Sequence, residues 1–228
     1  MIGTQVLTPH TMTLAWVVYT AVLGSAVWRS PWVELFPDRR RQHLLFGTCF
    51  AVFLLWLMRR DFDTGVSYHF IGMTAVTLLL DWPLAVVAGV VAQVGLCALG
   101  RQDLAGMGVN GLLFIALPVL VTESCAILVE RSQPKSPFVY IFCSGFLAAG
   151  LAAFLCLLSA LGLLWIEGVF EMPIWLEDFI GYLWLIIFPE AFINGMIVSA
   201  LVVFSPHWLE TFNRTRYLSA PWNDGGDA

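Results

Sequence analysis

Long apolar stretches separated by short charged segments dominate the chain. Of its 228 residues, 59% are hydrophobic and only 12% are charged, and the mean hydropathy is +0.82. Soluble domains are about half apolar and about a quarter charged. Because a helix needs about 20 mainly apolar residues to cross the hydrocarbon of a bilayer, these stretches predict an all-α integral membrane protein.

We expect one polytopic bundle of about seven transmembrane helices that forms a single domain over residues 1–228. The predicted spans are 12–28, 43–58, 68–80, 83–99, 109–129, 138–165 and 179–204, and residues 205–228 form a tail. No basic residue precedes the first span, so we expect it to be retained and not cleaved as a signal peptide. The third span is short, so it is either a tilted helix or half of a hairpin within the membrane. Other helices can shelter such a span.

Basic residues are distributed unequally over the predicted loops. Eight of the 11 lie on one side: Arg29, Arg39, Arg40, Arg41, Arg131, Lys135, Arg214 and Arg216. The other side carries Arg59, Arg60 and Arg101. The positive-inside rule places the first group in the cytoplasm. The N-terminus is therefore predicted outside, and the C-terminus with its tail inside.

The sequence lacks several motifs that would indicate other functions. It contains no GxxxxGK[ST] phosphate-binding loop, so we expect that the chain does not drive ATP-dependent transport by itself. It contains neither HExxH nor GxSxG, and we expect no enzymatic activity. The few, scattered basic residues argue against nucleic-acid binding. Five cysteines lie within apolar spans without CxxC spacing, which is typical of small buried side chains.

The segment 65–72 is the candidate functional stretch, because it places His69 where a charged loop meets an apolar span. Imidazole binds nickel, cobalt, copper and zinc, whereas thioether prefers softer ions. His10 and Met12 would lie on the same side as His69. Asp61 and Asp63, just upstream, would attract a cation electrostatically. Alternatively, His69 only anchors a helix end at the membrane interface.

A second group of polar residues lies within the predicted spans. Glu190 and Asn194 are four residues apart and therefore share one helix face. A charge at such depth costs about 3 kcal/mol on insertion scales. Glu190 therefore either pairs with another helix to fix the bundle or supports a ligand or a pathway. We assign Asn110 and Glu123, together with Gln93, to the same polar interior.

Three segments together resemble a known family. Residues 65–72, Gly-x-Ser-Tyr-His-x-x-Gly, are similar to the third-span motif of the cobalt/nickel substrate-binding membrane components of energy-coupling-factor transporters, the CbiM/NikM type. Residues 106–110, Gly-Met-Gly-Val-Asn, and residues 189–198, with Glu-Ala-x-Ile-x-Gly-x-x-Val, resemble two further patterns of that family. The likeness extends over residues 63–206.

The resemblance implies a seven-helix protein of the bacterial inner membrane with an external N-terminus. Its substrate would be a divalent transition-metal ion of the cobalt or nickel class, with no organic cofactor. Its partners would be a separate transmembrane coupling subunit and ATPase subunits. The family's histidine ligand matches His69. An alternative is a non-transport factor for metal handling or for assembly of a membrane metalloenzyme.

The chain departs from the family at its start. The family reads Met-His-Ile there, and the terminal amine and the second-residue histidine bind the metal. This chain reads Met1-Ile2, so the second residue offers no imidazole. We expect His10, with Met12, to substitute.

Overall fold

The computed structural model is almost entirely helical and describes residues 1–61, 65–132, 135–169 and 172–218. Four helical stretches in these ranges are long and apolar enough to cross a membrane: Pro9–Arg29, Met107–Ser132, Pro137–Ile166 and Leu183–Phe204. A shorter apolar helix covers Trp82–Ala98. The predicted all-α membrane class is confirmed, whereas the structure does not support seven full-length spans.

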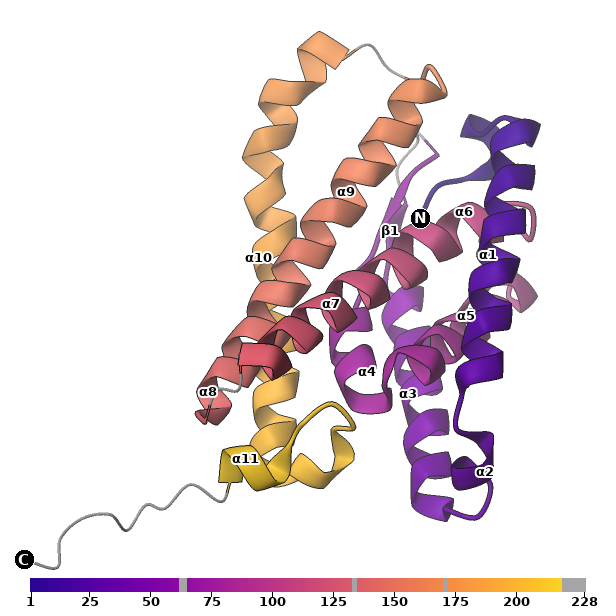
Figure 1. The fold of residues 1–228 in the computed structure, drawn as a ribbon. Coiled ribbons are helices and arrows are strands. Elements are labelled where there is room, and N and C mark those ends of the chain that lie inside the picture. Colours follow the sequence, from indigo (N-terminus) through magenta and orange to yellow (C-terminus); the bar gives the residue numbers. More distant parts are fainter. Residues whose placement is uncertain (62–64, 133–134, 170–171, 219–228) are drawn as a thin grey trace, which may run out of the picture.

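The elements follow one another as short and long helices with one small hairpin (Figure 1). The α-helices are α1 (Pro9–Arg29), α2 (Trp32–Leu35), α3 (Arg39–Leu57), α4 (Met73–Leu80), α5 (Trp82–Ala98), α6 (Met107–Gly111), α7 (Leu117–Ser132), α8 (Pro137–Val139), α9 (Ala148–Ile166), α10 (Met172–Phe204) and α11 (Arg214–Leu218). Strands β1 (Arg60–Asp61) and β2 (Ser67–Tyr68) pair antiparallel. Two 3₁₀ turns are η1 (Thr4–Val6) and η4 (Pro206–Trp208), and two π-helical segments, η2 (Leu112–Ala116) and η3 (Tyr140–Leu147), continue α6 into α7 and α8 into α9.

The helix of the second predicted span starts earlier than the sequence suggested. Asp38 caps α3 by accepting hydrogen bonds from the main-chain N–H groups of Arg40 (2.9 Å) and Arg41 (3.2 Å). An acidic side chain at this position pairs amides that have no partner within the helix. As a result α3 begins with the basic run and is apolar only over its later turns.

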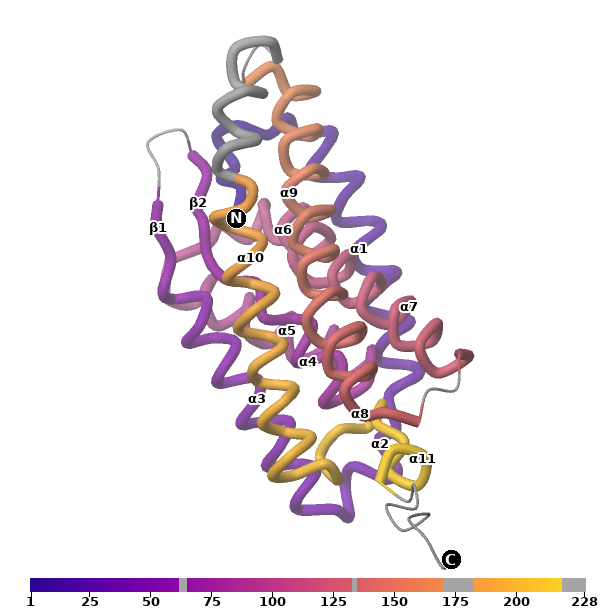
Figure 2. The backbone as a smooth tube through the Cα atoms, turned by 90° about the vertical axis from the view of Figure 1, so that its left-hand side faces the viewer, coloured from indigo at the N-terminus to yellow at the C-terminus, as the bar shows by residue number. Residues whose placement is uncertain are grey.

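The third predicted span, 68–80, is helical only over its later residues. Helix α4 begins at Met73 and has eight residues, which at 1.5 Å per residue is about 12 Å. Seven of the eight are buried. The helix lies inside the bundle with α3, α5, α7, α9 and α10 around it (Figure 2). The two predicted alternatives, a tilted helix and half of a hairpin within the membrane, both stay predictions.

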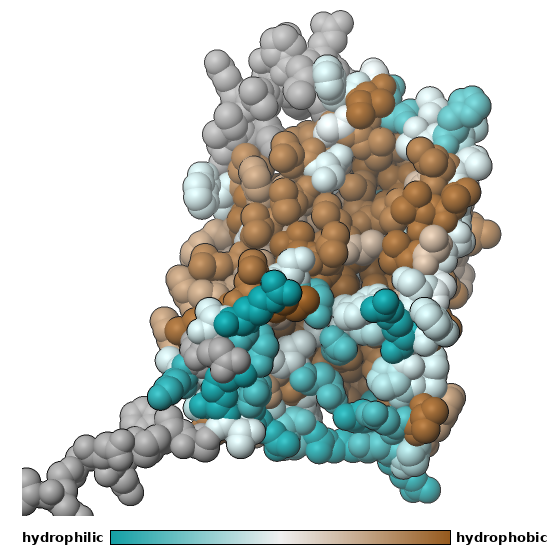
Figure 3. All heavy atoms as spheres, viewed as in Figure 1, coloured by the Kyte–Doolittle hydropathy of each residue, from teal (hydrophilic) through white to brown (hydrophobic). Residues whose placement is uncertain are grey.

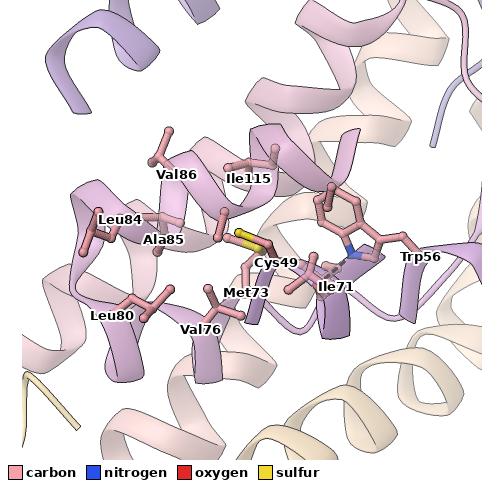
Figure 4. Packing of buried hydrophobic residues seen from close by; sticks show 14 of the residues in the cluster. Cys49, Trp56, Ile71, Met73, Val76, Leu80, Leu84, Ala85, Val86 and Ile115 are labelled. Carbon is pink, nitrogen blue, oxygen red and sulfur yellow. Dashed lines mark hydrogen bonds between the residues drawn. The ribbon is translucent and has the colours of Figure 1, made fainter. Parts of the chain in front are cut away.

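The main hydrophobic core joins α3, α4 and α5 (Figure 4). Trp56 and Met73 are fully buried in it. The indole Nε1 of Trp56 donates a hydrogen bond of 3.0 Å to the carbonyl of Ile71. This bond ties the last turns of α3 to the segment that precedes α4.

Helix α1 lies against α6 at very short range. A Cβ added at Gly108 would lie 2.8 Å from the main-chain nitrogen of Trp16, and one at Gly111 would lie 2.1 Å from the Tyr19 ring. Small residues allow helices to approach this closely in lipid. The Tyr19 hydroxyl then reaches Gln93 of α5 at 2.7 Å.

The polar residues gather at the two ends of a hydrophobic belt (Figure 3). At the end with α2 and α11, Arg41 pairs with Glu210 at 3.3 Å. At the other end, Arg101 pairs with Asp61 at 3.6 Å. These ends correspond to the two groups of loops separated by the charge count.

The C-terminal segment is packed against the bundle as far as the structure describes it. The Thr211 hydroxyl donates to the carbonyl of Leu78 (3.0 Å), and Phe212 is 5% exposed. Helix α10 starts at Met172, before the first residue of the predicted seventh span, 179–204. Residues 219–228 of the predicted tail lie outside the described ranges.

Candidate metal centre

His69 is a buried imidazole with one unpaired nitrogen. It follows β2 and is 3% exposed. Its Nδ1 lies 2.9 Å from the carbonyl of Phe70, and a carbonyl only accepts, so Nδ1 carries the proton. The lone pair is then on Nε2, which is buried and has no hydrogen-bond partner among the described residues. The rings of Trp56 (5.5 Å) and Phe114 (5.3 Å) hold the imidazole.

Two side chains of α10 hold the segment that carries His69. The Glu190 carboxylate accepts hydrogen bonds from the main-chain N–H groups of Ile71 (2.9 Å) and Gly72 (2.7 Å). Asn194 accepts one from the N–H of Ala75 at 2.9 Å, and its Nδ2 donates to Glu190 at 2.8 Å. These amides form the first turn of α4 and the approach to it, where a helix leaves N–H groups unpaired and carries a partial positive charge. Glu190 and Asn194 thus cap α4 from another helix.

Gly72 gives the chain the turn that this arrangement needs. Its φ is +69°, a backbone conformation that residues other than glycine rarely adopt. A Cβ there would also lie 2.7 Å from Leu55. The helix consequently begins one residue after Gly72, and residues 69–72 stay non-helical.

The first three residues of the chain lie alongside residues 65–67. The N–H of Gly3 donates to Gly65 (2.8 Å), and the N–H of Ser67 donates to Met1 (2.7 Å). Asn110 binds both polar main-chain groups of Ile2. Its Oδ1 accepts a hydrogen bond from the Ile2 N–H at 2.7 Å, and its Nδ2 donates one to the Ile2 carbonyl at 2.9 Å. Met1 and Ile2 are buried beside the His69 segment.

The α-amino group of Met1 donates a hydrogen bond to the carbonyl of Ser67. Burial, assisted by the positive charge of Arg59, lowers the pKa of this amino group from 8.0 to about 5. Since this pKa lies below neutrality, the amine is uncharged at pH 7 and offers a lone pair.

A cavity of about 220 Å³ adjoins His69. Apolar side chains form most of its wall, and the largest share of them comes from α9. The other contributors are Met1, Ser67, Tyr68, His69, Cys156 and Glu190. A water molecule occupies about 30 Å³, so the cavity has room for a cation with several waters. The arrangement offers nitrogen donors at the edge of an otherwise apolar space.

A second, more polar cavity of about 270 Å³ lies on the other side of Met1 and Ile2, which line both. Asp61 lines it and is paired with Arg59 (2.8 Å) and Arg101 (3.6 Å). A hydrogen bond from Ser67, with these two guanidinium groups, lowers the pKa of Asp61. Asp61 is therefore charged but compensated. The other predicted cation-attracting residue, Asp63, lies outside the described residues.

The structure does not place the remaining predicted ligands beside His69. His10 is exposed in the first turn of α1 and lines neither cavity. Met12 is half-buried against the cluster that contains Ile2. Among the described residues, no three His, Cys, Asp or Glu side chains form a group that could hold a metal.

The other predicted polar residues have structural contacts. Asn110 holds Ile2, as described above, and Gln93 accepts a hydrogen bond from Tyr19. Glu123 is half-buried in α7, and its Oε2 has no partner within the described part of the chain. The sequence reasoning missed Met1 and Cys156 as cavity residues. The signal for Met1 was the resemblance itself, because the family's terminal amine binds the metal.

Comparison with known proteins places these features in a family. A family model described as CbiM, cobalt uptake substrate-specific transmembrane region, matches residues 2–208. No curated protein sequence matches the chain significantly.

Two solved structures share the fold. One, described as a transition metal transporter, has a TM-score of 0.72 at 16% identity and covers 89% of this chain and 92% of its own. The other, described as a truncated transition metal transporter, has a TM-score of 0.67 at 15% identity and covers 89% and 98%.

Proposed function

Because the chain belongs to the CbiM family, the cobalt uptake substrate-specific transmembrane regions, we propose that it is the substrate-binding membrane subunit of a transition-metal uptake transporter. The observation that carries the proposal is the unpaired, buried Nε2 of His69 beside a cavity. A buried polar atom without a partner is costly, and a bound cation would satisfy it.

The ion would be held by His69 Nε2 and by the amino group of Met1, with the remaining positions filled by water or main-chain oxygen. Imidazole and amine nitrogen suit cobalt and nickel. His69 already has its Nδ1 proton fixed by the Phe70 carbonyl at 2.9 Å, and such a bond orients a histidine ligand. His10 is not part of this proposal, because it is exposed and outside the cavity.

Energy for uptake would come from other chains. The sequence contains no phosphate-binding loop, so a separate transmembrane coupling subunit and ATPase subunits would be needed, as in energy-coupling-factor transporters. The protein would lie in the bacterial inner membrane as one domain over residues 1–228. The end that carries α2 and α11 would face the cytoplasm, because most basic residues lie there.

The test is elemental analysis of the purified protein after incubation with cobalt, nickel, copper or zinc ions. We expect one cobalt or nickel ion per chain in the unchanged protein and none in His69→Ala, whereas His10→Ala serves as the matched control and should retain the ion. Retention of the ion by His69→Ala would refute the assigned site.

Loss of the ion from both variants would mean that His10 also supports metal binding, and it would refute the proposal that leaves His10 out of the site. If the unchanged protein binds no ion and co-purifies with a metalloenzyme in place of an ATPase, the assembly-factor alternative replaces transport. The absence of an imidazole at Ile2 favours that alternative.

A further inference from the structure

A groove of about 600 Å³ lies between α3 and α10 and shares no lining residue with the His69 cavity. Its walls are the apolar side chains of Leu44 from α3 and of Ile197 and Leu201 from α10, and Leu79 of α4 lines it between them. Gly47 opens onto it, since a Cβ built there would have no atom within 4 Å. The groove is therefore mostly apolar, and no side chain of the protein fills it.

Both helices that form the groove face outward with large apolar side chains. Phe46 and Phe50 of α3 are 67% and 61% exposed, and Val203 of α10 is 69% exposed. In a membrane protein, such surfaces belong in the hydrocarbon of the bilayer. A groove that opens into the bilayer would be filled by lipid, because its walls offer water few hydrogen-bond partners.

One end of the groove is cationic. Arg40 and His43 line it, and none of the described acidic residues does. The neighbouring Arg41 has three carboxylates within 4.0 Å, on Glu34, Asp38 and Glu210. For Arg40 no carboxylate partner is found among the described residues.

Arg40 is nevertheless held in place. Its Nη2 donates a hydrogen bond of 2.7 Å to the carbonyl of His207 in η4, the turn that follows α10. The guanidinium has five N–H donors in a fixed fork, so most remain available. Trp208, which also lines the groove, is the residue type found where hydrocarbon meets headgroups.

We propose that this groove binds an anionic phospholipid. The phosphate lies at Arg40 and His43, and one acyl chain runs past Gly47 between Leu44 and Ile197. Basic pockets between transmembrane helices recognise acidic headgroups in this way, and Arg pairs well with phosphate. This lipid site is separate from the metal centre and does not depend on the metal-uptake proposal.

The test compares phosphatidylglycerol with phosphatidylcholine, added in mixed micelles to the purified full-length protein. Native mass spectrometry counts retained lipids, and thermal unfolding measures stabilisation. We expect phosphatidylglycerol to bind at least tenfold more tightly than phosphatidylcholine and to raise Tm. Arg40→Ala with His43→Ala should abolish this preference, whereas Arg39→Ala, in the same basic run but outside the groove, should keep it.

Gly47→Leu tests the acyl-chain part without changing any charge or the Arg40 contact. It should fold, because the position is open, and it should lose retained phosphatidylglycerol. Equal binding of the two lipids, equal loss in Arg39→Ala and the groove variants, or unchanged lipid retention in Gly47→Leu would each overturn the proposal. So would loss of a co-purifying membrane subunit in Gly47→Leu with lipid retention intact, because the groove would then seat a protein helix.

Discussion

Replacing Glu190 by Gln is the sharpest test of how the His69 segment is held. The carboxylate accepts three hydrogen bonds, from the N–H groups of Ile71 and Gly72 and from the Asn194 amide. The side chain is 4% exposed, so water does not replace a lost partner. A glutamine has nearly the same shape, but only one of its two terminal atoms accepts a hydrogen bond.

The expected cost follows from these contacts. If the glutamine oxygen stays opposite Gly72, that bond loses its charge assistance, which costs about 1 kcal/mol. The glutamine NH₂ then faces the N–H of Ile71, and an unpaired buried donor costs about 1–3 kcal/mol. Part of this loss is offset, because the neutral glutamine removes the desolvation cost of a buried carboxylate. The net destabilisation is therefore about 2 kcal/mol, a factor of about 30 in the equilibrium that orders residues 69–72.

Metal affinity and stability are both measured, by titration calorimetry with cobalt and by thermal unfolding. Glu190→Gln should weaken binding by about 10- to 30-fold and lower Tm. Glu123→Gln is the control, because it removes a half-buried carboxylate from a different transmembrane helix without touching residues 69–72. It should leave the affinity unchanged.

Two results would refute the reasoning. Wild-type affinity in Glu190→Gln would mean that the contacts to Ile71 and Gly72 do not position His69. An equal loss of affinity in Glu123→Gln would mean that any intramembrane carboxylate supports binding, for instance through its charge.

Three further predictions concern other parts of the fold. Asn110→Leu leaves the N–H and C=O of Ile2 unpaired, so it should lower the free energy of unfolding by about 2 kcal/mol. It should also weaken cobalt binding in the same titration. Unchanged binding would show that Ile2 is not needed as a cavity wall. Gly111→Ala places a Cβ 2.1 Å from the Tyr19 ring, and such overpacking should cost about 1–3 kcal/mol in thermal unfolding, whereas a wild-type Tm would disprove the close crossing. A hydrogen bond from a threonine hydroxyl of α1 lowers the pKa of Glu167. Its stabilising contribution is therefore present above its unfolded pKa and is lost as the pH falls through its lower folded pKa. Amide exchange near residue 8 should then speed up, and Glu167→Gln should abolish that pH response.

The membrane class and the family could be predicted from the sequence. Both depend on features that a single chain displays directly, the apolar stretches and the order of three motifs, and both are confirmed. His69 was selected because it stands at the boundary between a charged loop and an apolar span. Its role as a ligand stays a prediction, although its buried and unpaired Nε2 supports it.

The number and lengths of the spans could not be predicted in the same way. Residues 68–80 are apolar enough to continue a helix, and the structure begins that helix only at Met73. The reason is tertiary: Glu190 and Asn194, more than 100 residues away, bind the amides that an earlier helical turn would have used. Apolar periodicity carries no information about such a partner.

The position of His10 shows a second limit of sequence reasoning. Sequence placed His10 on the predicted outer side, but sidedness alone does not decide which way a helix face points. Thr8 caps α1 so that Pro9 is its first residue, and the first turn leaves His10 exposed. Met1 lines the cavity instead, because Asn110 and Ser67 bind the main chain of the first two residues. The spacing of residues in the sequence does not predict these contacts.

Helix α4 explains why the site belongs to the assembled bundle and not to its local sequence. A helix of eight residues is marginal in isolation, since helices below about 12 residues rarely form alone. Its first turn is capped by Glu190 and Asn194 of α10, and near its other end the Leu78 carbonyl accepts from Thr211 of the C-terminal segment. Both ends thus depend on chain that is synthesised last. A fragment that ends before α10 would keep the whole 65–72 motif and would not hold His69 in this position.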